Sequence, residues 1–239
     1  MNVEITKLTD VKLLQRANSF TTGRDSHMTL AKAYRAGHSP IRTQLFWVEC
    51  TDIPLFVASQ LVRSHVGVQL FQRSKRTDRG GEDFRVECHD FGQRLDIVAE
   101  NVNEGLSEKE ADDLTQTLGE MENEVKAWSS RFDRYAPTDI AFIINAEALI
   151  NMAHKRLCAK ASAETRDLMT KIALEIAIVD PELAEHLVPQ CVFRGGLCTE
   201  PKTCGWIYSG VGQSVLTSYV DMLNEVKSQK QRKITNQKK

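Results

Sequence analysis

The stretch that decides the fold reads Leu45-Phe-Trp-Val-Glu-Cys50. These residues are β-prone and follow a turn signal at Gly37-His-Ser-Pro40, so they are predicted to form a strand. The next residues, Thr51-Asp-Ile-Pro54, favour a helix N-cap with a proline in the first turn, which predicts a helix from Ile53 to about Ser64. Because most side chains of this helix are apolar, we expect it to be buried.

Further elements are predicted downstream of this strand and helix. Shorter strands are expected at Phe84–Phe91 and Arg94–Val98. The capping box Ser107-Glu-Lys-Glu110 begins a long helix that runs to about Arg131. A second helical region extends from about Ile144 to Ile178, with a possible break near 160–162, and Asp180-Pro181 begins another short helix.

The whole chain of 239 residues has 41% hydrophobic residues and a net charge of -1. We expect one domain over residues 1–226 and a basic, disordered tail over 227–239. With a net charge this small, a polyanion needs a local basic patch rather than a global field. The chain carries neither a signal peptide nor an apolar run of membrane-spanning length, so it is expected to be soluble and cytoplasmic, or in the host cytoplasm if viral.

The first candidate binding feature is the basic segment that begins at the end of the buried helix. Gln60, Arg63 and Ser64 have the spacing of one helix face, and a buried Arg63 needs a carboxylate or an anionic ligand. Arg73, Ser74, Lys75, Arg76 and Arg79 follow in a glycine-containing loop. Guanidinium, hydroxyl and amide groups of this kind bind phosphate, although a basic run is also typical of a solvated surface.

The late helical region supplies a second candidate feature. If it is one continuous helix, Asn145, Arg156 and Lys160 lie within about 60° of one another and could face one cavity. The alternative is a polar surface stripe.

These features together resemble the flavin-dependent thymidylate synthases. The signature of that family, Arg-His-Arg, seven or eight residues, Ser, then Arg two positions later, is similar to Arg63-Ser-His65, eight residues and Ser74-Lys-Arg76. The upstream His38-Ser-Pro40 turn, strand and Gln60-bearing helix resemble the family, as do Asn145-Ala-Glu-Ala-Leu-Ile-Asn151, Arg156 and Ala161-Ser-Ala-Glu164 downstream. Three blocks in the family order cover roughly His38 to Arg166.

The resemblance implies an α+β fold, a single domain with a mixed or antiparallel sheet packed against long helices. It also implies a homotetramer whose active sites lie between subunits, with FAD, methylenetetrahydrofolate and NADPH. The activity implied is transfer of a one-carbon unit to C5 of a pyrimidine nucleotide monophosphate, with dUMP as the expected substrate and reduced flavin completing the methyl group. No membrane and no stable nucleic-acid partner are expected.

The resemblance also assigns residues to the two sides of the site. Arg156 and Arg63 are the expected catalytic residues, with Arg156 at the pyrimidine carbonyl and Ser74 and Arg76 at the phosphate. The nucleotide side comprises Gln60, Arg63, Ser74, Lys75, Arg76, Arg134 and Arg156, with Arg131 as the alternative to Arg134. The flavin and folate side comprises His38, Ser64, His65, Gln72, Asn145, Asn151 and Lys160.

The chain departs from the family pattern mainly on the flavin side. At five positions this chain differs from the family: it has Ser64 where the family has His, His65 where it has Arg, Gln72 where it has Glu, Glu147 where it has Arg and Lys160 where it has His. Such a pattern also suits a relative in which water captures the transferred carbon, giving a hydroxymethyl product from dUMP or dCMP. The sequence leaves the product, the base and the use of flavin open.

Three cysteines, Cys191, Cys198 and Cys204, cluster outside the blocks that resemble the family. Their spacing differs from that of common zinc modules, so no metal site is assigned and buried thiols are the preferred interpretation. A disulfide is possible, and zinc with Cys158, His154 or His186 as the fourth ligand is the alternative. In Cys88-His89, adjacent strand positions point to opposite faces, which argues against a catalytic dyad.

A different functional class also fits part of the chain. The basic segment from Arg63 to Arg79, with the tail, could form a nucleic-acid-binding module, which predicts salt-dependent binding to DNA or RNA. The near-neutral net charge argues against this interpretation.

Overall fold

The computed structural model describes residues 1–73 and 136–236 and, between these ranges, residues 93, 114, 116–121, 123 and 134. The chain forms two compact units, Met1–Phe71 with Thr138–Lys239, and Gln72–Pro137. The strands expected at 84–91 and 94–98 lie outside the described residues, as does most of the helix expected from Ser107 to Arg131. The residues described between 114 and 123 are helical.

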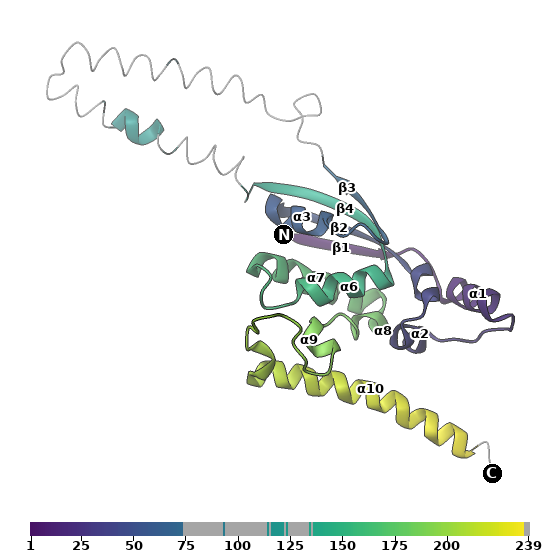
Figure 1. Ribbon diagram of the computed structural model, residues 1–239. Helices are drawn as coiled ribbons and strands as arrows, with labels where there is room; N and C mark the ends of the chain where they lie inside the picture. Colours follow the sequence, from purple (N-terminus) through teal and green to yellow (C-terminus); the bar gives the residue numbers. More distant parts are fainter. Residues whose placement is uncertain are drawn as a thin grey trace. The chain divides into compact units, whose positions relative to one another are not determined.

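A four-stranded sheet forms the centre of the first unit, in the order β1-β2-β4-β3. The strands are β1 (Asn2–Lys7), β2 (Leu45–Pro54), β3 (Val68–Gln72) and β4 (Pro137–Asn145). β1 pairs antiparallel with β2, from Asn2 opposite Thr51 to Lys7 opposite Phe46. The Ala146 amide donates to the Gln44 carbonyl at 2.9 Å and the Asp52 amide to Asp139 Oδ1 at 2.9 Å, so β2 and β4 also run in opposite directions. The predicted α+β fold is confirmed, with an antiparallel sheet (Figure 1).

The helix after β2 begins later than predicted. It is α3 (Leu55–Val62), with Pro54 rather than Thr51 or Asp52 at the N-cap position. The predicted cap is wrong because sheet pairing continues the strand, since Thr51 pairs with Asn2 and the Asp52 amide is taken by Asp139. The expected burial of this helix is confirmed, because Val57, Ala58 and Leu61 are buried.

The predicted helical region at 144–178 consists of two helices, α6 (Ala146–Arg156) and α7 (Ala163–Val179). The predicted break therefore exists and spans 157–162, so Lys160 lies in a turn. The short helix predicted at Asp180-Pro181 is α8 (Pro181–Ala184), and the Asp180 carboxylate accepts from the Leu183 amide at 3.1 Å. The N-terminal region adds α1 (Val11–Thr22), α2 (Leu30–Ala36) and the 3-10 helix η1 (Ser39–Thr43).

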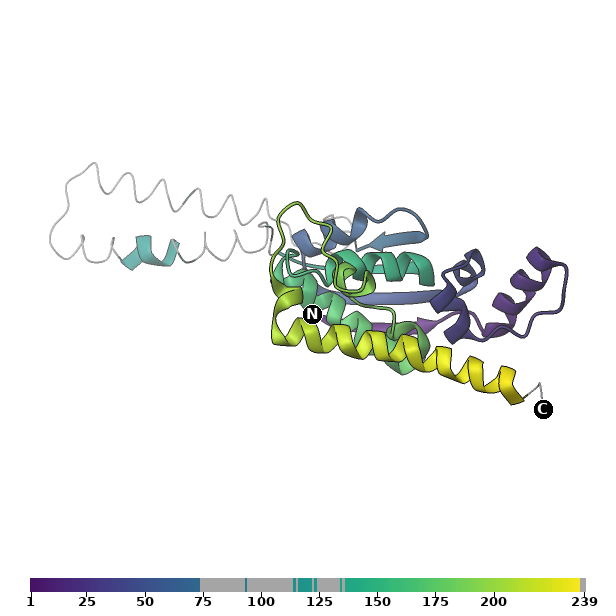
Figure 2. The same ribbon diagram turned by 60° about the horizontal axis from the view of Figure 1, so that its bottom comes forward.

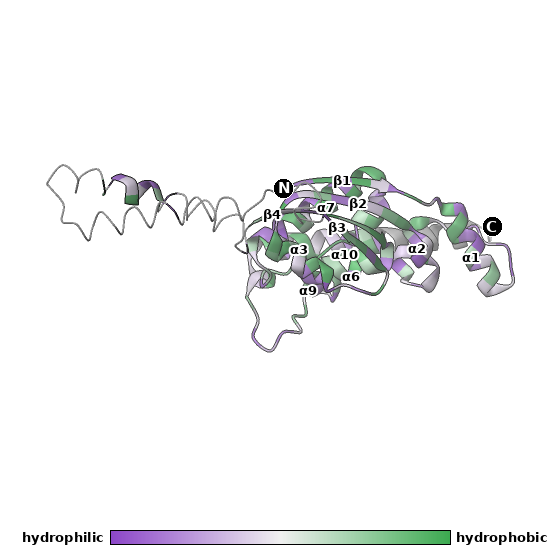
Figure 3. Ribbon diagram, turned by 90° about the horizontal axis from the view of Figure 1, so that it is seen from above, coloured by the Kyte–Doolittle hydropathy of each residue, from purple (hydrophilic) through white to green (hydrophobic). Residues whose placement is uncertain are grey.

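Within the first unit, α6 and α7 cover one face of the sheet, and α10 (Gly210–Asn236) lies beyond them (Figures 1 and 2). The sheet and the helices against it carry most of the buried apolar side chains, including Phe46, Phe142 and Leu149. Figure 3 shows hydrophobic residues along the strands of the sheet. A separate, much smaller cluster of Val192, Ile207 and Tyr219 holds α9 (Gln190–Phe193), η3 (Trp206–Tyr208) and α10 together. Ring contacts join these elements to the rest of the unit, Phe193 with His154 at 4.4 Å and Tyr219 with His186 at 6.4 Å between ring centroids.

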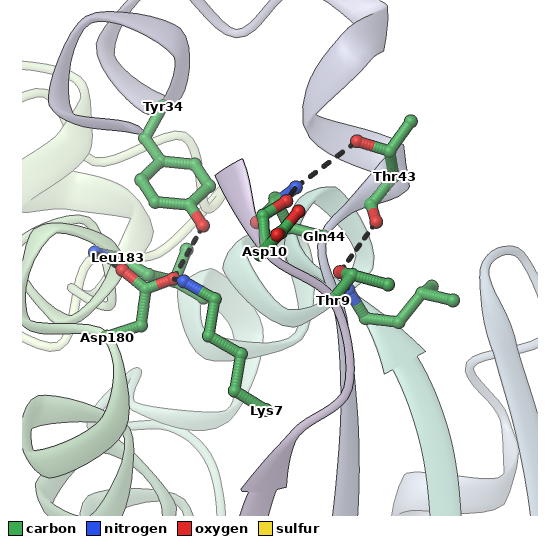
Figure 4. A network of polar contacts seen from close by, with 9 residues as sticks. Lys7, Thr9, Asp10, Tyr34, Thr43, Gln44, Asp180 and Leu183 are labelled. Carbon is green, nitrogen blue, oxygen red and sulfur yellow. Dashed lines mark hydrogen bonds and ion pairs between the residues drawn. The ribbon is translucent and has the colours of Figure 1, made fainter. Parts of the chain in front are cut away.

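A buried carboxylate joins the elements around α8 (Figure 4). Asp180 is 1% exposed and accepts hydrogen bonds from Lys7 Nζ and Tyr34 OH, both at 2.7 Å. Burial, followed by the nearby Asp180 carboxylate, raises the pKa of Tyr34. These contacts link β1, α2 and the start of α8 through one fully paired charge.

The backbone of α10 is helical through Asn236, although residues 227–239 are predicted to be a disordered tail. Side chains beyond Asn224 lie outside the described residues, and the disorder of the tail stays a prediction. Among the helices that the structure describes, none is long and apolar enough to cross a membrane.

Candidate functional site

Three helices meet at Gln60, which lies on α3. Arg156, the last residue of α6, donates a hydrogen bond from its guanidinium to the Gln60 carbonyl. Thr165, in the first turns of α7, donates from Oγ1 to Gln60 Oε1 at 3.2 Å, and Ser162 donates to Thr165 Oγ1 at 2.8 Å. The backbone carbonyl and the side-chain oxygen of Gln60 therefore each accept a hydrogen bond, and Arg156 is held at the end of its helix.

Arg63 lies one turn beyond Gln60, at the C-cap of α3, and is exposed. Burial lowers the pKa of Arg156, and the charge of Arg63 lowers it further, so the two cations act on each other electrostatically. Among the described residues, neither arginine forms an ion pair with a carboxylate. Two such cations without an acidic partner favour binding of an anion or of a polarisable carbonyl oxygen.

A cavity of about 500 Å³ opens beside Gln60 and Arg156. Its other walls are the turn between α6 and α7 and the segment from Gln190 to Ile207. Four cations line it, Lys155, Arg156, Lys160 and Arg194, against one carboxylate, Glu200. Lys160 Nζ lies 3.3 Å from Glu200 Oε2, so that pair is satisfied and the remaining excess of positive charge suits an anionic ligand.

The expected common face of Asn145, Arg156 and Lys160 is wrong, because the helix ends at Arg156. Arg156 and Lys160 line the cavity, whereas Asn145 caps the opposite end of α6. Its side-chain oxygen accepts from the Ala148 amide at 2.9 Å, and its backbone amide donates to the Gly67 carbonyl at 3.0 Å. Asn145 therefore supports the chain just after Arg63 rather than the cavity.

The other residues expected on the flavin side are mostly exposed. His38, His65, Gln72 and Asn151 are exposed, and Ser64 is half-buried. His38 is the N-cap residue of η1, and Gln72 ends β3. Their roles stay predictions.

Several residues expected at the nucleotide lie outside the described residues or in the second unit. Ser74, Lys75, Arg76 and the alternative Arg131 are outside the described residues. Arg134 is described but belongs to the unit Gln72–Pro137. Their placement at the site therefore stays a prediction.

Arg42 is a residue that the sequence analysis missed. Its Nε donates to Glu147 Oε2 at 2.6 Å and its Nη2 to Glu147 Oε1 at 3.2 Å. This pair offsets the negative charge that Glu147 introduces where the family pattern has arginine. The signal available in the sequence was weak, namely an arginine in the turn four residues after His38.

The cavity also gathers four cysteines: Cys158, Cys191, Cys198 and Cys204. All are free thiols, so the possible disulfide is absent from this part of the structure. The expected burial is only partly correct, because Cys191 and Cys198 are half-buried and Cys204 is exposed. Cys88 and His89 lie outside the described residues.

Comparisons with known proteins agree with this fold and show the family of the chain. A family model described as "Thymidylate synthase complementing protein" matches residues 9–182. A flavin-dependent thymidylate synthase of Clostridium tetani (strain Massachusetts / E88) is 30% identical over 185 residues, which are 71% of this chain and 73% of that protein.

Solved structures show the same fold at lower sequence identity. The crystal structure of the flavin-dependent thymidylate synthase ThyX from Helicobacter pylori, complexed with FAD and dUMP, has a TM-score of 0.51 and 16% identity, covering 79% of this chain and 100% of that chain. A second ThyX structure from Helicobacter pylori with FAD and dUMP has a TM-score of 0.50 at the same identity, covering 78% and 99%.

Proposed function

This chain belongs to the flavin-dependent thymidylate synthase family, and we propose that it transfers a one-carbon unit from methylenetetrahydrofolate to C5 of dUMP. The observation that carries the proposal is Arg156, held at the cavity by its hydrogen bond to Gln60, with the charge of Arg63 acting on it and no ion pair to a carboxylate for either arginine among the described residues. A pyrimidine nucleotide monophosphate offers both a phosphate and ring carbonyl oxygens to such cations.

In this proposal Arg156 polarises the pyrimidine. Its hydrogen bond to the Gln60 carbonyl orients the guanidinium before the substrate binds, so reorganisation during the reaction is small. A fixed positive charge at a ring carbonyl stabilises electron density that moves through the ring when C5 attacks the donor carbon. Arg63 and Gln60 would bind the nucleotide, and Ser74, Lys75 and Arg76 would bind its phosphate.

The described residues fit a flavin cofactor because the charge of Glu147 is offset by Arg42. Glu147 would repel a flavin diphosphate, but two hydrogen bonds from Arg42 offset its charge, and the Arg42 side chain remains 60% exposed. His38, His65, Asn145 and Asn151 would hold FAD, with Ser64, Gln72 and Lys160 nearby. Reduced FAD would supply the hydride that completes the methyl group, and NADPH would reduce it.

The exposure of this flavin side supports a homotetramer. His38, His65 and Asn151 are exposed in the single chain, and a cofactor bound between subunits would cover such groups. Arg134 would then join the nucleotide site.

The test combines binding with product analysis. Purified protein is incubated with dUMP, methylenetetrahydrofolate, FAD and NADPH, and the molecular mass of the nucleotide product is measured by mass spectrometry. We expect a methylated product and, in calorimetry, at least tenfold weaker dUMP binding for Arg63→Gln. Arg16→Gln, an exposed arginine of α1, is the matched control and should bind normally. A protein that binds neither FAD nor dUMP contradicts the proposal.

Hydroxymethyl transfer is a second candidate because the departures concentrate on the flavin side. Lys160, where the family pattern has histidine, pairs with Glu200 and lines the cavity beside Arg156. The same experiment with dUMP or dCMP distinguishes the products, since a hydroxymethyl nucleotide retains an additional oxygen.

A further inference from the structure

We propose that the cavity beside Arg156 binds an oxyanion of a substrate, a phosphate or a carboxylate, and that Arg194 is one of its binding residues. Arg194 belongs to the segment 190–207, which lies beyond the family match at residues 9–182. The inference deepens the proposed function and rests on it for the identity of the substrate. It gives this C-terminal segment a part in substrate binding.

The cavity has the size and the lining of a small-molecule site. Its volume is about 500 Å³, within the range of roughly 300–1,000 Å³ that such sites occupy. Trp206 and the buried Ile207 form an apolar part of its wall, and polar side chains of α6 and of the segment 190–207 line the rest. Small-molecule sites combine apolar walls with a few converging polar groups in the same way.

Arg194 is held at the cavity by the end of α9. It is the C-cap residue of that helix, and its backbone amide donates to the Gln190 carbonyl at 3.1 Å. Gly196 completes the turn, because its amide donates to the Cys191 carbonyl at 2.8 Å with a φ of 99°, which glycine adopts at little cost. The backbone under Arg194 is therefore fixed by local hydrogen bonds, while its side chain lines the cavity.

A buried histidine without a polar partner lines the same cavity. His154 is 4% exposed, and its Nε2 has no hydrogen-bond partner among the described residues. The ring of Phe193 packs against the imidazole at 4.4 Å between ring centroids, so the residue next to Arg194 contacts His154. A buried nitrogen without a partner is costly, and a ligand oxygen in the cavity would give it one.

The protonation state of His154 suits donation to an anion. Burial lowers its pKa to about 4, with the charges of His186 and Arg194 acting in the same direction, so the ring is neutral at pH 7. A neutral imidazole carries one proton, which on Nε2 would donate to a ligand oxygen. The guanidinium of Arg194 and this imidazole would then bind one oxyanion together.

The charges around the cavity leave two cations for such a group. Lys160 is paired with Glu200, and Arg156 acts at the pyrimidine carbonyl in the proposed function. Lys155 and Arg194 remain, and neither forms an ion pair with a carboxylate within the described ranges. A guanidinium binds a phosphate or a carboxylate through two parallel hydrogen bonds, so these cations favour an oxyanion over a neutral ligand.

Two substrates of the proposed reaction carry a group of this kind. dUMP carries a phosphate, and methylenetetrahydrofolate carries the carboxylates of its glutamate. Both groups accept the forked hydrogen bonds of arginine, so the chemistry of the cavity is the same for either substrate. Binding experiments with and without the anionic group distinguish them.

Calorimetry on the full-length protein tests the assignment. We expect Arg194→Gln to weaken binding of one substrate by about tenfold, because charge-assisted hydrogen bonds are lost. A loss for dUMP but not for deoxyuridine identifies the phosphate, and a loss for tetrahydrofolate but not for a tetrahydropterin without glutamate identifies the carboxylate. Arg24→Gln, an exposed arginine just after α1, is the matched control and should bind both substrates normally.

The opposite results are equally specific. Unchanged affinity of Arg194→Gln for both substrates overturns the assignment, as does an equal loss with and without the anionic group. Wild-type protein that binds neither substrate contradicts the proposed function instead. Titration with inorganic phosphate then tests the cavity alone: binding that Arg194→Gln weakens supports the anion site, and the absence of such a difference overturns it.

A measurement on the wild-type protein stays valid if the variant folds poorly. Inorganic phosphate should shift the side-chain nitrogen resonances of His154 in NMR spectra, because Nε2 gains an acceptor. The exposed His27 is the control and should keep its resonances. Resonances of His154 that stay unchanged at saturating phosphate would overturn its place in the site.

Discussion

Asp180 is a fully buried charge and Arg156 a half-buried one, and only Asp180 is paired with an opposite charge among the described residues. Asp180 is 1% exposed and accepts from Lys7, Tyr34 and the Leu183 amide. Arg156 has a backbone carbonyl as its partner, and the charge of a second cation, Arg63, acts on it. The charge of Asp180 is therefore neutralised within the chain, whereas that of Arg156 is not.

The difference separates a structural charge from a binding charge. A buried charge whose partners are all internal stabilises one arrangement of the chain, and removing a partner is expensive. A cation held beside a cavity without an acidic partner weakens the fold slightly and is retained where a ligand supplies the missing charge. Mutations at the two regions should therefore separate stability from activity.

The largest effect is expected for Asp180→Asn. The change removes the charge that partners Lys7 and weakens the bond from Tyr34, so the free energy of unfolding should fall by about 3 kcal/mol in urea denaturation. Asp167→Asn is the control, because Asp167 pairs with Lys171 at the surface, at 3.6 Å, and should change stability little. Equal effects of the two substitutions would show that Asp180 is not a special position.

The next effect concerns catalysis rather than stability. Arg156→Gln should lower kcat/KM by roughly 100-fold, because it removes the fixed charge proposed to act at the pyrimidine. Its free energy of unfolding should stay equal or rise, since a desolvated cation disfavoured by the charge of Arg63 is lost. Steady-state kinetics and urea denaturation on the same preparation test the expected fall in kcat/KM and the unchanged or higher free energy of unfolding. A variant that loses both activity and stability would contradict the assignment of Arg156 as a binding charge.

A smaller effect is expected where the chain after Arg63 meets Asn145. At Gly67, with φ of 76°, an added Cβ would lie 2.3 Å from the Asn145 side chain, so Gly67→Ala combines backbone strain with a steric clash. Gly23→Ala has similar strain, with φ of 66°, and open space around the Cβ. We expect about 1 kcal/mol of destabilisation from Gly23→Ala and clearly more from Gly67→Ala by thermal denaturation. Equal destabilisation by the two substitutions would mean that the Asn145 side chain moves aside without cost.

The smallest effect is a pH dependence near the paired region. Burial lowers the pKa of His186, with a further contribution from Arg35, and His186 makes an edge contact with Tyr34 at 6.4 Å between ring centroids. Burial also lowers the pKa of His154, to about 4, with His186 and Arg194 adding to the effect. Both histidines are favoured in the neutral form, so their contribution is complete above the unfolded pKa of about 6.5 and is lost as the pH falls toward 4.

The melting temperature between pH 7.5 and pH 5 measures this dependence. We expect the wild-type protein to lose stability on acidification and His186→Phe to lose less, because one of the two protonation sites is removed. A steeper acid loss in His186→Phe than in the wild type would contradict the assignment.

Much of the fold followed from local sequence signals. The strand at residues 45–50, the buried helix after it, the break between α6 and α7 and the cap at Asp180 all depend on neighbouring residues. The start of α3 did not, because pairing of Thr51 with Asn2 and capture of the Asp52 amide by Asp139 come from distant strands. Local capping preferences yield when sheet hydrogen bonds offer the same amide a better partner.

The sequence by itself determined the α+β class and the family resemblance, and it predicted roles for Gln60, Arg63 and Arg156. The tertiary structure alone decided which charges have partners. It brought Arg42 to Glu147 across 105 positions and Lys7 to Asp180 across 173, and it gathered four cysteines at one cavity. Spacing along a chain fixes neighbours within one helix or strand, whereas contacts between elements depend on packing of the whole core.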